Sequence, residues 1–300
     1  MKLAKERKME YFESFKTKDI TLALRDHIQN IRQSFGHESA SHAFTSLFLW
    51  QKDMELSVCL REQAFAVRCG YLDAWFFPCG EQEEILRFVR DILDRFPGAQ
   101  FVYLRREDVA LLQERFPERF HFKLSEDASE YLYDRTEYAT LPGSKYQNIR
   151  WSINHLKHHH ELRVEPLNTD NINTVSALLA AWKPHSAGEN YSPDHATATL
   201  MLDNFEALEM RGIAVHLDGH IAAIAAGFPL SDHSFDIAFS KASDRETGLL
   251  HYARRELVKT LPDHYTVING EEDLGIPGLR RAKQLERPMG QIEMFEAYAQ

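Results

Sequence analysis

The chain has little cysteine, no long hydrophobic run and a shortage of positive charge, and each shortage argues against a class of protein. Its three cysteines, Cys59, Cys69 and Cys79, are too few for a disulfide framework and lack the close pairing of a zinc site. No stretch approaches the ~20 apolar residues of a membrane-spanning helix. The 35 basic and 45 acidic residues give a net charge of −10. We therefore expect no broad nucleic-acid binding and no DNA partner.

The start of the chain, MKLAKERKMEYFESFK, is charged throughout, whereas a secretory signal would carry an apolar centre. We therefore expect a cytoplasmic protein without an integral membrane segment. Its 300 residues, 44% of them hydrophobic, suffice for two domains of ordinary size.

Strand and helix signals follow the same order in both halves of the chain. The first half predicts a hairpin at 55–60 and 64–69, a strand at 73–78, a helix at 85–96, a strand at 101–104 and a helix at 109–116. The second half predicts a strand at 162–167, helices at 172–182 and from 192, a hairpin at 213–228, a strand at 235–240, a helix from 248 and a strand at 265–269. In the second hairpin, Asp218-Gly219 is typical of a type I′ turn.

The repeated order of hairpin, strand, helix, strand and helix predicts an α/β (α+β) fold made of two related units. Each unit is expected to hold a mixed sheet flanked by helices. We expect an N-terminal unit at 1–140, a linker helix at 141–160 and a C-terminal unit at 161–300.

Two segments resemble a known family. YLYDRTEYATLPGSKYQNIRWSIN and VINGEEDLGIPGLRRAKQLERP are similar to the signature stretches of a domain family of unknown function related to the C-terminal catalytic domain of bacterial phosphatidylglycerol lysyltransferase. The matching positions are Gly143, Lys145, Arg150 and Asn154 in the first segment, and Asn269, Asp273, Gly275, Gly278, Leu279, Arg280 and Lys283 in the second. The resemblance implies tandem acyl-CoA N-acyltransferase (GNAT) units, with kinship to the Fem transferases that use aminoacyl-tRNA.

One run departs from the family pattern. Gln284-Leu285-Glu286-Arg287 stands where a Ser-Tyr-Lys type of run is expected before Pro288. This departure bears on the substrate more than on the fold.

GNAT domains hold the pyrophosphate of coenzyme A in a glycine-containing loop at a helix N-terminus. Residues 245–250 keep half of that loop, with Arg245 and Gly248 in place and a leucine where the second glycine belongs. Residues 78–84 of the first half place acidic and amide groups there, which would repel a phosphate. We therefore expect the active site in the C-terminal unit and a non-catalytic N-terminal unit. A plain helix start is the alternative interpretation of Gly248.

Acyl transfer needs a base, oxyanion donors and positive charge for the donor's phosphates. The candidates for catalysis are Asn269, Glu271, Glu272 and Asp273, just past a strand end. Backbone N–H groups where strands 235–240 and 265–269 separate would bind the oxyanion. The candidates for donor binding are Lys145, Arg150, Asn154, Arg245, Gly248, Arg280 and Lys283. Acids at helix starts and bases at helix ends would also produce this pattern without any function.

These residues predict an acyl- or aminoacyl-transferase that moves a group from acyl-CoA or aminoacyl-tRNA to an amine or hydroxyl of a small molecule or peptide. No tightly bound cofactor is expected, and tRNA would be a partner only as donor. A catalytically inactive ligand-binding or regulatory protein of the same fold is the alternative.

Two other constellations predict no site. The side chains of the run His158-His159-His160 would point in different directions on a helix, so one metal ion could not bind all three well, and we predict no metal there. His185, Ser186 and Asp194 lack the Gly-x-Ser-x-Gly elbow of a hydrolase.

Overall fold

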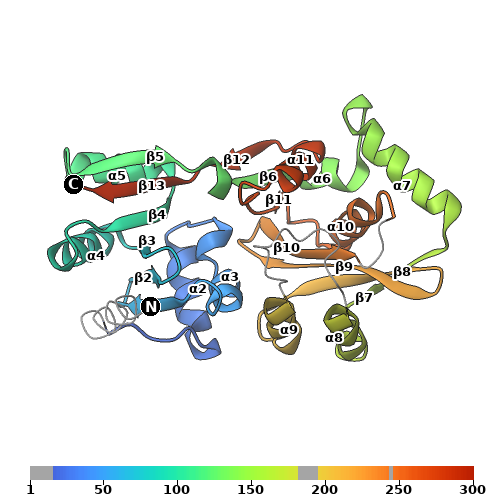
Figure 1. Ribbon diagram of the computed structural model, residues 1–300, viewed down its shortest axis with the longest axis horizontal. Coiled ribbons are helices and arrows are strands. Elements are labelled where there is room, and N and C mark those ends of the chain that lie inside the picture. Colours follow the sequence, from blue (N-terminus) through green and yellow to red (C-terminus); the bar gives the residue numbers. More distant parts are fainter. Residues whose placement is uncertain (1–15, 182–194, 243–245) are drawn as a thin grey trace. The chain divides into compact units, whose positions relative to one another are not determined.

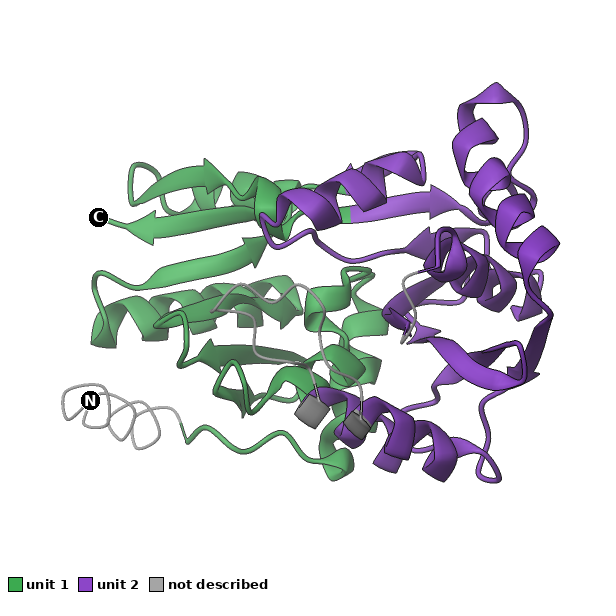
Figure 2. Ribbon diagram, turned by 45° about the vertical axis from the view of Figure 1, so that its right-hand side comes forward, with its two compact units in different colours: residues 1–130, 292–300 green, residues 131–291 purple. Residues whose placement is uncertain are grey.

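The computed structural model describes residues 16–181, 195–242 and 246–300 (Figure 1). The chain forms two compact units, which we call unit 1 (Met1–Glu130 and Ile292–Gln300) and unit 2 (Tyr131–Gln291) (Figure 2). Within the described ranges, no helix combines the length and the apolar character needed to cross a membrane.

Unit 1 contains a six-stranded mixed sheet in the order β1-β2-β3-β4-β13-β5. The first three strands are antiparallel, β3 and β4 are parallel, and β13 lies antiparallel between β4 and β5. The bounds are β1 (Leu56–Leu60), β2 (Ala64–Cys69), β3 (Ala74–Gly80), β4 (Gln100–Leu104), β5 (Phe120–Leu124) and β13 (Phe295–Ala299).

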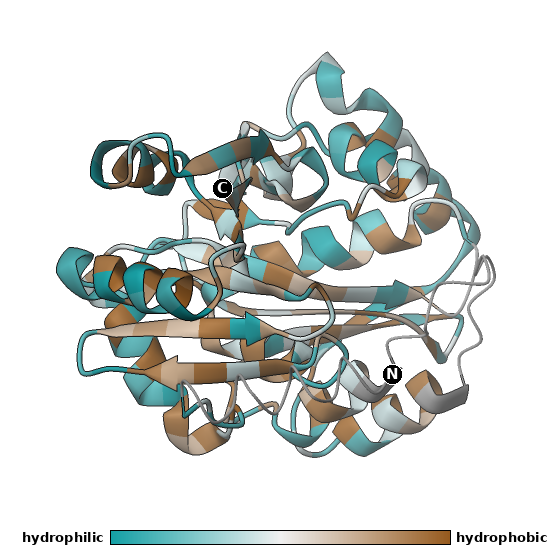
Figure 3. Ribbon diagram, turned by 60° about the vertical axis from the view of Figure 1, so that its left-hand side comes forward, coloured by the Kyte–Doolittle hydropathy of each residue, from teal (hydrophilic) through white to brown (hydrophobic). Residues whose placement is uncertain are grey.

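Helices coloured by hydropathy show brown and teal residues side by side (Figure 3). In α4 the side chains of Ile85, Phe88, Val89 and Ile92 are buried, as their spacing predicts. The helices are α2 (Arg25–Ser34), α3 (Phe44–Trp50), α4 (Gln82–Arg95) and α5 (Arg106–Arg115), with short 3₁₀ turns η1 (Leu22–Leu24), η2 (Ala40–His42) and η3 (Glu126–Ala128).

Unit 2 contains a seven-stranded mixed sheet in the order β12-β6-β11-β10-β9-β8-β7. Strands β7 to β10 are antiparallel, β10 and β11 are parallel, and β6 is antiparallel to β11. The bounds are β6 (Glu130–Asp134), β7 (Leu162–Pro166), β8 (Arg211–Leu217), β9 (His220–Pro229), β10 (Ser234–Ala242), β11 (Val267–Asn269) and β12 (Gly290–Ile292). The predicted turn between β8 and β9 is confirmed, since Asp218 and Gly219 have φ of 49° and 90°.

The helices of unit 2 are α6 (Arg135–Thr140), α7 (Gln147–His159), α8 (Ile172–Ala181), α9 (His195–Asp203), α10 (Leu249–Thr260) and α11 (Pro277–Leu285), with the 3₁₀ turn η4 (Ser144–Tyr146). α10 packs on β8, β9 and β10 and also contacts α6 and α7. The predicted helix residues 182 and 192–193 lie outside the described part of the chain.

Both units repeat one arrangement. An antiparallel hairpin leads into a strand, a helix crosses to a parallel strand, and an antiparallel strand lies beyond that one in the sheet: β3-α4-β4 with β13 in unit 1, and β10-α10-β11 with β6 in unit 2. The fold is α/β (α+β), with two tandem units that each hold a mixed sheet flanked by helices, as predicted.

The unit boundaries differ from the expected ones at 140 and 160. β6, α6 and α7 belong to unit 2, and the C-terminal strand β13 belongs to unit 1. The reason is long-range strand pairing: β6 buries Tyr131 and Tyr133 beside β11, and β13 buries Ala297 between β4 and β5. Such pairing leaves no local signal in the sequence.

Candidate active site

Two parallel strands of unit 2 separate where the predicted catalytic segment begins. β10 and β11 pair at three positions, the last being Asp236 beside Asn269, and β10 then continues to Ala242 along β9. β11 ends at Asn269, where the chain leaves the sheet (Figure 1). The carboxyl ends of parallel strands are where open α/β sheets bind their ligands.

The chain beyond β11 forms a sharply bent loop at residues 270–276. Glu271, Leu274 and Gly275 all have positive φ, a conformation that costs about 1–2 kcal/mol for a residue with a side chain. The buried Asn269 side chain shapes the first bend, because its Oδ1 accepts a hydrogen bond of 2.7 Å from the Glu271 N–H. The Tyr131 backbone of β6 holds the same bend from the other side, donating to the Glu271 carbonyl at 3.1 Å.

Asp273 and Arg280 are brought together as a pair. The fully buried Asp273 carboxylate accepts hydrogen bonds from Arg280 Nε (2.8 Å), Tyr131 Oη (2.7 Å) and the Gly275 N–H (2.9 Å). Burial alone would raise the pKa of this carboxyl, but these donors outweigh it and hold the pKa below its usual range. Both groups are thus occupied in fixing α11 to the loop.

Lys283 and Glu272 are the pair with opposing pKa shifts. The buried ammonium of Lys283 donates to the carbonyls of Gly270 and Glu271, and burial, reinforced by the nearby Arg254, lowers its pKa. Burial raises the pKa of the half-buried Glu272 carboxyl, and the negative charge of Asp273 adds to that effect, while Lys283 opposes it. Carboxyl and amine groups shifted toward neutrality are the usual acids and bases of active sites.

A second charged group lies beside the loop and is formed by α10 and the residue that follows α11. The buried Glu286 carboxylate accepts from His251 Nδ1 at 3.0 Å and lies 3.4 Å from Arg254 Nη2. Burial would raise the pKa of Glu286, but Arg254 and His251 outweigh it and hold the pKa low. Gly270 makes room for this group, since an added Cβ would lie 2.7 Å from the Tyr133 ring and 3.3 Å from Arg254 Nη2.

The predicted binding residues at the start of α7 serve the turn that precedes that helix. Arg150 donates to the carbonyls of Leu141 and Gly143, and Lys145 forms an exposed ion pair with Glu137. Asn154 is exposed on α7. None of these contacts joins the three side chains to Lys283, Glu272 or the Asp273–Arg280 pair.

Gly248 begins α10 with φ of 91°, but its surroundings are protein backbone. An added Cβ would lie 2.7 Å from the backbone carbonyl of Ser152 on α7, so close helix packing requires glycine here. Arg245 lies outside the described residues. In unit 1 the equivalent helix start is capped by its own acid, since the Glu81 side chain accepts from the Glu84 N–H at 3.0 Å.

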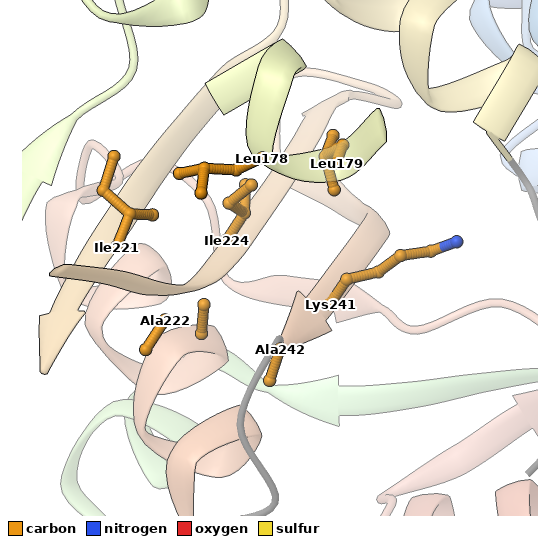
Figure 4. A pocket seen from close by; sticks show the side chains of 8 residues that line it. Leu178, Leu179, Ile221, Ala222, Ile224, Lys241 and Ala242 are labelled. Atoms are coloured by element: carbon orange, nitrogen blue, oxygen red, sulfur yellow. The ribbon is translucent and has the colours of Figure 1, made fainter. Parts of the chain in front are cut away.

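A shallow apolar hollow lies elsewhere on unit 2, between α8 and strands β9 and β10 (Figure 4). Leu178 and Leu179 face Ile221 and Ile224 across it, with Lys241 at its edge. None of the predicted site residues lines it.

A comparison with protein families shows to which family the chain belongs. The family model described as "Phosphatidylglycerol lysyltransferase, C-terminal" matches residues 32–290. The chain belongs to this family. Membership supports a transferase of aminoacyl groups and leaves donor and acceptor open.

Solved structures share the fold of this chain. A conserved protein of unknown function from Bacteroides thetaiotaomicron VPI-5482 is 27% identical, with a TM-score of 0.86 over 95% of this chain and 99% of that one. The C-terminal domain (DUF2156) of a putative lysylphosphatidylglycerol synthetase from Agrobacterium fabrum is 16% identical, with a TM-score of 0.63 over 93% and 92% of the chains. L-PGS from Bacillus licheniformis is also 16% identical, with a TM-score of 0.61 over 91% of each chain. Comparison with curated proteins returned no match.

Sequence reasoning missed several residues of the site: Tyr131, Tyr133, His251, Arg254 and Glu286. Arg254 stands between the buried Ala253 and Leu257 on the inner side of α10, and a cation at such a position is a usable signal for a buried ion pair. Its partner Glu286 lies in the run that departs from the family pattern. The run that departs from the family pattern therefore contains a buried acid, Glu286, that contacts His251 and Arg254 of α10.

Proposed function

We propose that the chain is an acyl- or aminoacyl-transferase with its active site in unit 2, at the end of β11. One observation carries this proposal: at the loop where β10 and β11 separate, Lys283 binds the carbonyls of Gly270 and Glu271, and the pKa values of Lys283 and the neighbouring Glu272 shift in opposite directions. Family membership supports the same class of reaction. Unit 1 is proposed to be non-catalytic.

The proposed reaction begins at the acceptor. The Glu272 carboxylate takes the proton of an amine or hydroxyl, whose nitrogen or oxygen then attacks the carbonyl carbon of an acyl-CoA thioester or an aminoacyl-tRNA ester. Backbone N–H groups at the separated strands stabilise the oxyanion. The C–S or C–O bond to the donor then breaks, and the leaving group takes up a proton. Glu271 is proposed to bind the acceptor's positive charge.

The roles of the remaining residues follow from their contacts. Lys283 fixes the backbone of Gly270 and Glu271, and Asn269, Asp273 and Arg280 hold the loop and α11 in place. Acyl-CoA and aminoacyl-tRNA are molecules of the cytoplasm, and we propose that the reaction takes place there.

The test is a transfer assay with both donors. Acyl-CoA and aminoacyl-tRNA, each labelled in the group to be transferred, are supplied with a panel of amines and hydroxyl compounds, and labelled product is measured. Glu272→Gln should slow transfer by about a hundredfold, the size of a general-base contribution. It should also remove the limb of the pH profile on which kcat/KM rises as the Glu272 carboxyl ionises.

The matched control is Arg281→Gln, which removes an exposed charge from the same helix as Lys283 and should transfer at the wild-type rate. Lys283→Gln should lose transfer while remaining folded. Binding of a donor without any transfer by the wild type would overturn the enzyme proposal in favour of a ligand-binding protein.

A further inference from the structure

His251 of unit 2 lies beside a buried acid and keeps contact with solvent. Its Nδ1 is 3.0 Å from Glu286 Oε1, and the side chain of His251 is 22% exposed whereas that of Glu286 is 4% exposed. Within the part of the chain that the structure describes, the other ring nitrogen, Nε2, has no hydrogen-bond partner. The ring is therefore held through one nitrogen, and its second nitrogen is left for a ligand.

The charge of Glu286 fixes the tautomer of His251. Burial would raise the pKa of Glu286, but Arg254, whose Nη2 lies 3.4 Å from Glu286 Oε2, and His251 itself outweigh burial and hold the pKa low. A carboxylate can only accept hydrogen bonds, so Nδ1 of His251 is the donor. The neutral ring then presents the lone pair of Nε2, and the protonated ring presents an Nε2–H in the same place. Enzymes orient an acid–base histidine by this arrangement of imidazole and buried carboxylate.

His251 also lies at the sheet edge that holds the candidate active site. It belongs to the first turn of α10, which connects the parallel strands β10 and β11, so this turn lies at the edge where β11 ends. One turn further along α10, Arg254 Nη2 lies 3.3 Å from the position that a Cβ on Gly270 would take. The Gly270 carbonyl accepts a hydrogen bond from Lys283. The His251–Glu286 pair is thus part of the surroundings of the loop at 270–276.

We propose that His251 is the general acid of the transfer reaction and that Glu286 positions it. This inference rests on the proposed function, in which Glu272 takes the acceptor's proton and the leaving group must gain one. Protonated His251 gives its Nε2 proton to the thiolate or the ribose oxygen as the C–S or C–O bond breaks, and becomes neutral. The charge of Glu286 stabilises the imidazolium, which the positive end of α10 disfavours. Between turnovers Glu272 releases one proton to water and His251 takes one up, so the protons balance.

The test compares donors whose leaving groups need a proton to different degrees. Aminoacyl-tRNA, acyl-CoA and the thiophenyl ester of the same acyl group are supplied with the acceptor that gives labelled product in the transfer assay. His251→Ala should slow transfer from aminoacyl-tRNA about a hundredfold, the size of a general-acid contribution. Transfer from acyl-CoA should slow less, because a thiolate is a weaker base than an alkoxide. Transfer from the thiophenyl ester should stay near the wild-type rate, since thiophenolate leaves without a proton.

A second variant and a matched control test the pair. Glu286→Gln keeps an oxygen for the Nδ1–H of His251 and removes the charge, so it should show the same dependence on the donor. Imidazole added to His251→Ala should restore part of the rate, because it supplies the missing acid. The control is His264→Ala, which removes an exposed histidine just beyond the other end of α10 and should match the wild type with all three donors. Circular dichroism and the melting temperature check that the variants are folded.

The outcomes separate this inference from the proposed function. Wild-type rates in His251→Ala would overturn the general-acid role and leave the transferase standing. Equal slowing with all three donors, without rescue by imidazole, would do the same and make His251 a structural residue. A wild-type protein that transfers from none of the donors would end both proposals.

Discussion

At the scale of single residues, the Asp273–Arg280 pair shows what one buried carboxylate contributes to the candidate site. Asp273→Asn keeps the size of the side chain and removes the charge that Arg280 and Tyr131 contact. We expect the free energy of unfolding to fall by about 2–3 kcal/mol, because donors to a charged group lose their acceptor. Urea unfolding of both proteins measures the change.

The control and the pH dependence make this prediction sharper. Asp263→Asn breaks an ion pair with Arg135 in which the Asp263 side chain is 98% exposed, and should cost less than about 1 kcal/mol. Because the pKa of Asp273 is lowered in the folded state, its stabilisation is complete above about pH 4 and is lost as pH falls through the folded pKa. The two proteins should therefore converge in stability below that pH. Equal losses at Asp263 and Asp273 would contradict the pairing.

The sequence identified several residues that lie at the candidate site, but it did not predict the contacts that they make there. Asp273, Arg280 and Lys283 were identified from the signature segment, but Asp273 and Arg280 neutralise each other, and Lys283 binds backbone carbonyls. Their spacing could not reveal this, because it depends on the positive φ of Glu271 and Leu274 and on Tyr131 from a distant strand.

At the scale of elements, Gly248 distinguishes packing from phosphate binding. Gly248→Ala should destabilise the protein by about 2–4 kcal/mol, the sum of a strained φ and a clash with the backbone of Ser152 on α7. Gly219→Ala is the matched control, since its φ of 90° is nearly the same and no atom lies within 4 Å of the added Cβ. It should cost only about 1–2 kcal/mol. Equal urea midpoints for the two variants would remove the packing explanation.

Unit 1 buries two neutral histidines around η2. The rings of His37 and His42 have centroids 4.2 Å apart, with the Ser39 hydroxyl 3.2 Å from His37 Nδ1, while His42 Nε2 donates to the Phe77 carbonyl at 2.8 Å. Burial lowers the pKa of His42 to about 3 and that of His37 well below its usual value, with Arg32 and Arg105 adding to the effect.

This arrangement predicts an acid-sensitive unit 1. The unfolded chain takes up protons on both histidines below about pH 6.5 and the folded unit does not. His42 therefore costs about 1.4 kcal/mol per pH unit as pH falls from there toward its folded pKa of about 3, and the lowered pKa of His37 adds to this loss. His42→Gln, which keeps a donor for Phe77, should flatten the decline seen in melting scans at pH 7, 6 and 5. An unchanged slope in this variant would show that His42 is not the group responsible.

Strongly periodic elements were predictable because their signal is local. α4 buries the face that its spacing indicates, and the Asp218-Gly219 turn adopts the expected backbone. In α10, Leu249, Ala253 and Leu257 are buried, but Leu250 is exposed. β6 was not recognised as a strand, because its partner β11 lies more than a hundred residues away and only that pairing buries Tyr131 and Tyr133.

At the scale of the whole molecule, the chain completes unit 1 with its last strand. The repeated element order predicted two related sheets, but β13 leaves unit 2 in sequence and pairs with β4 and β5 of unit 1. Composition and periodicity treat residues 292–300 as the end of the second half. Neither composition nor periodicity could therefore predict that β13 pairs within the sheet of unit 1.

Removing residues 292–300 should consequently unfold unit 1, although the deletion lies at the far end of the sequence. It exposes the edges of β4 and β5 and removes Ala297, which is fully buried in the core of that unit. Limited proteolysis with mass spectrometry should show cleavage throughout residues 16–130 and protection of residues 131–291. Ala297→Asp should reproduce this pattern, because a buried unpaired carboxylate costs several kcal/mol, whereas Ala297→Ser should resemble the wild type. Protection of residues 16–130 in the truncated chain would mean that unit 1 folds without β13.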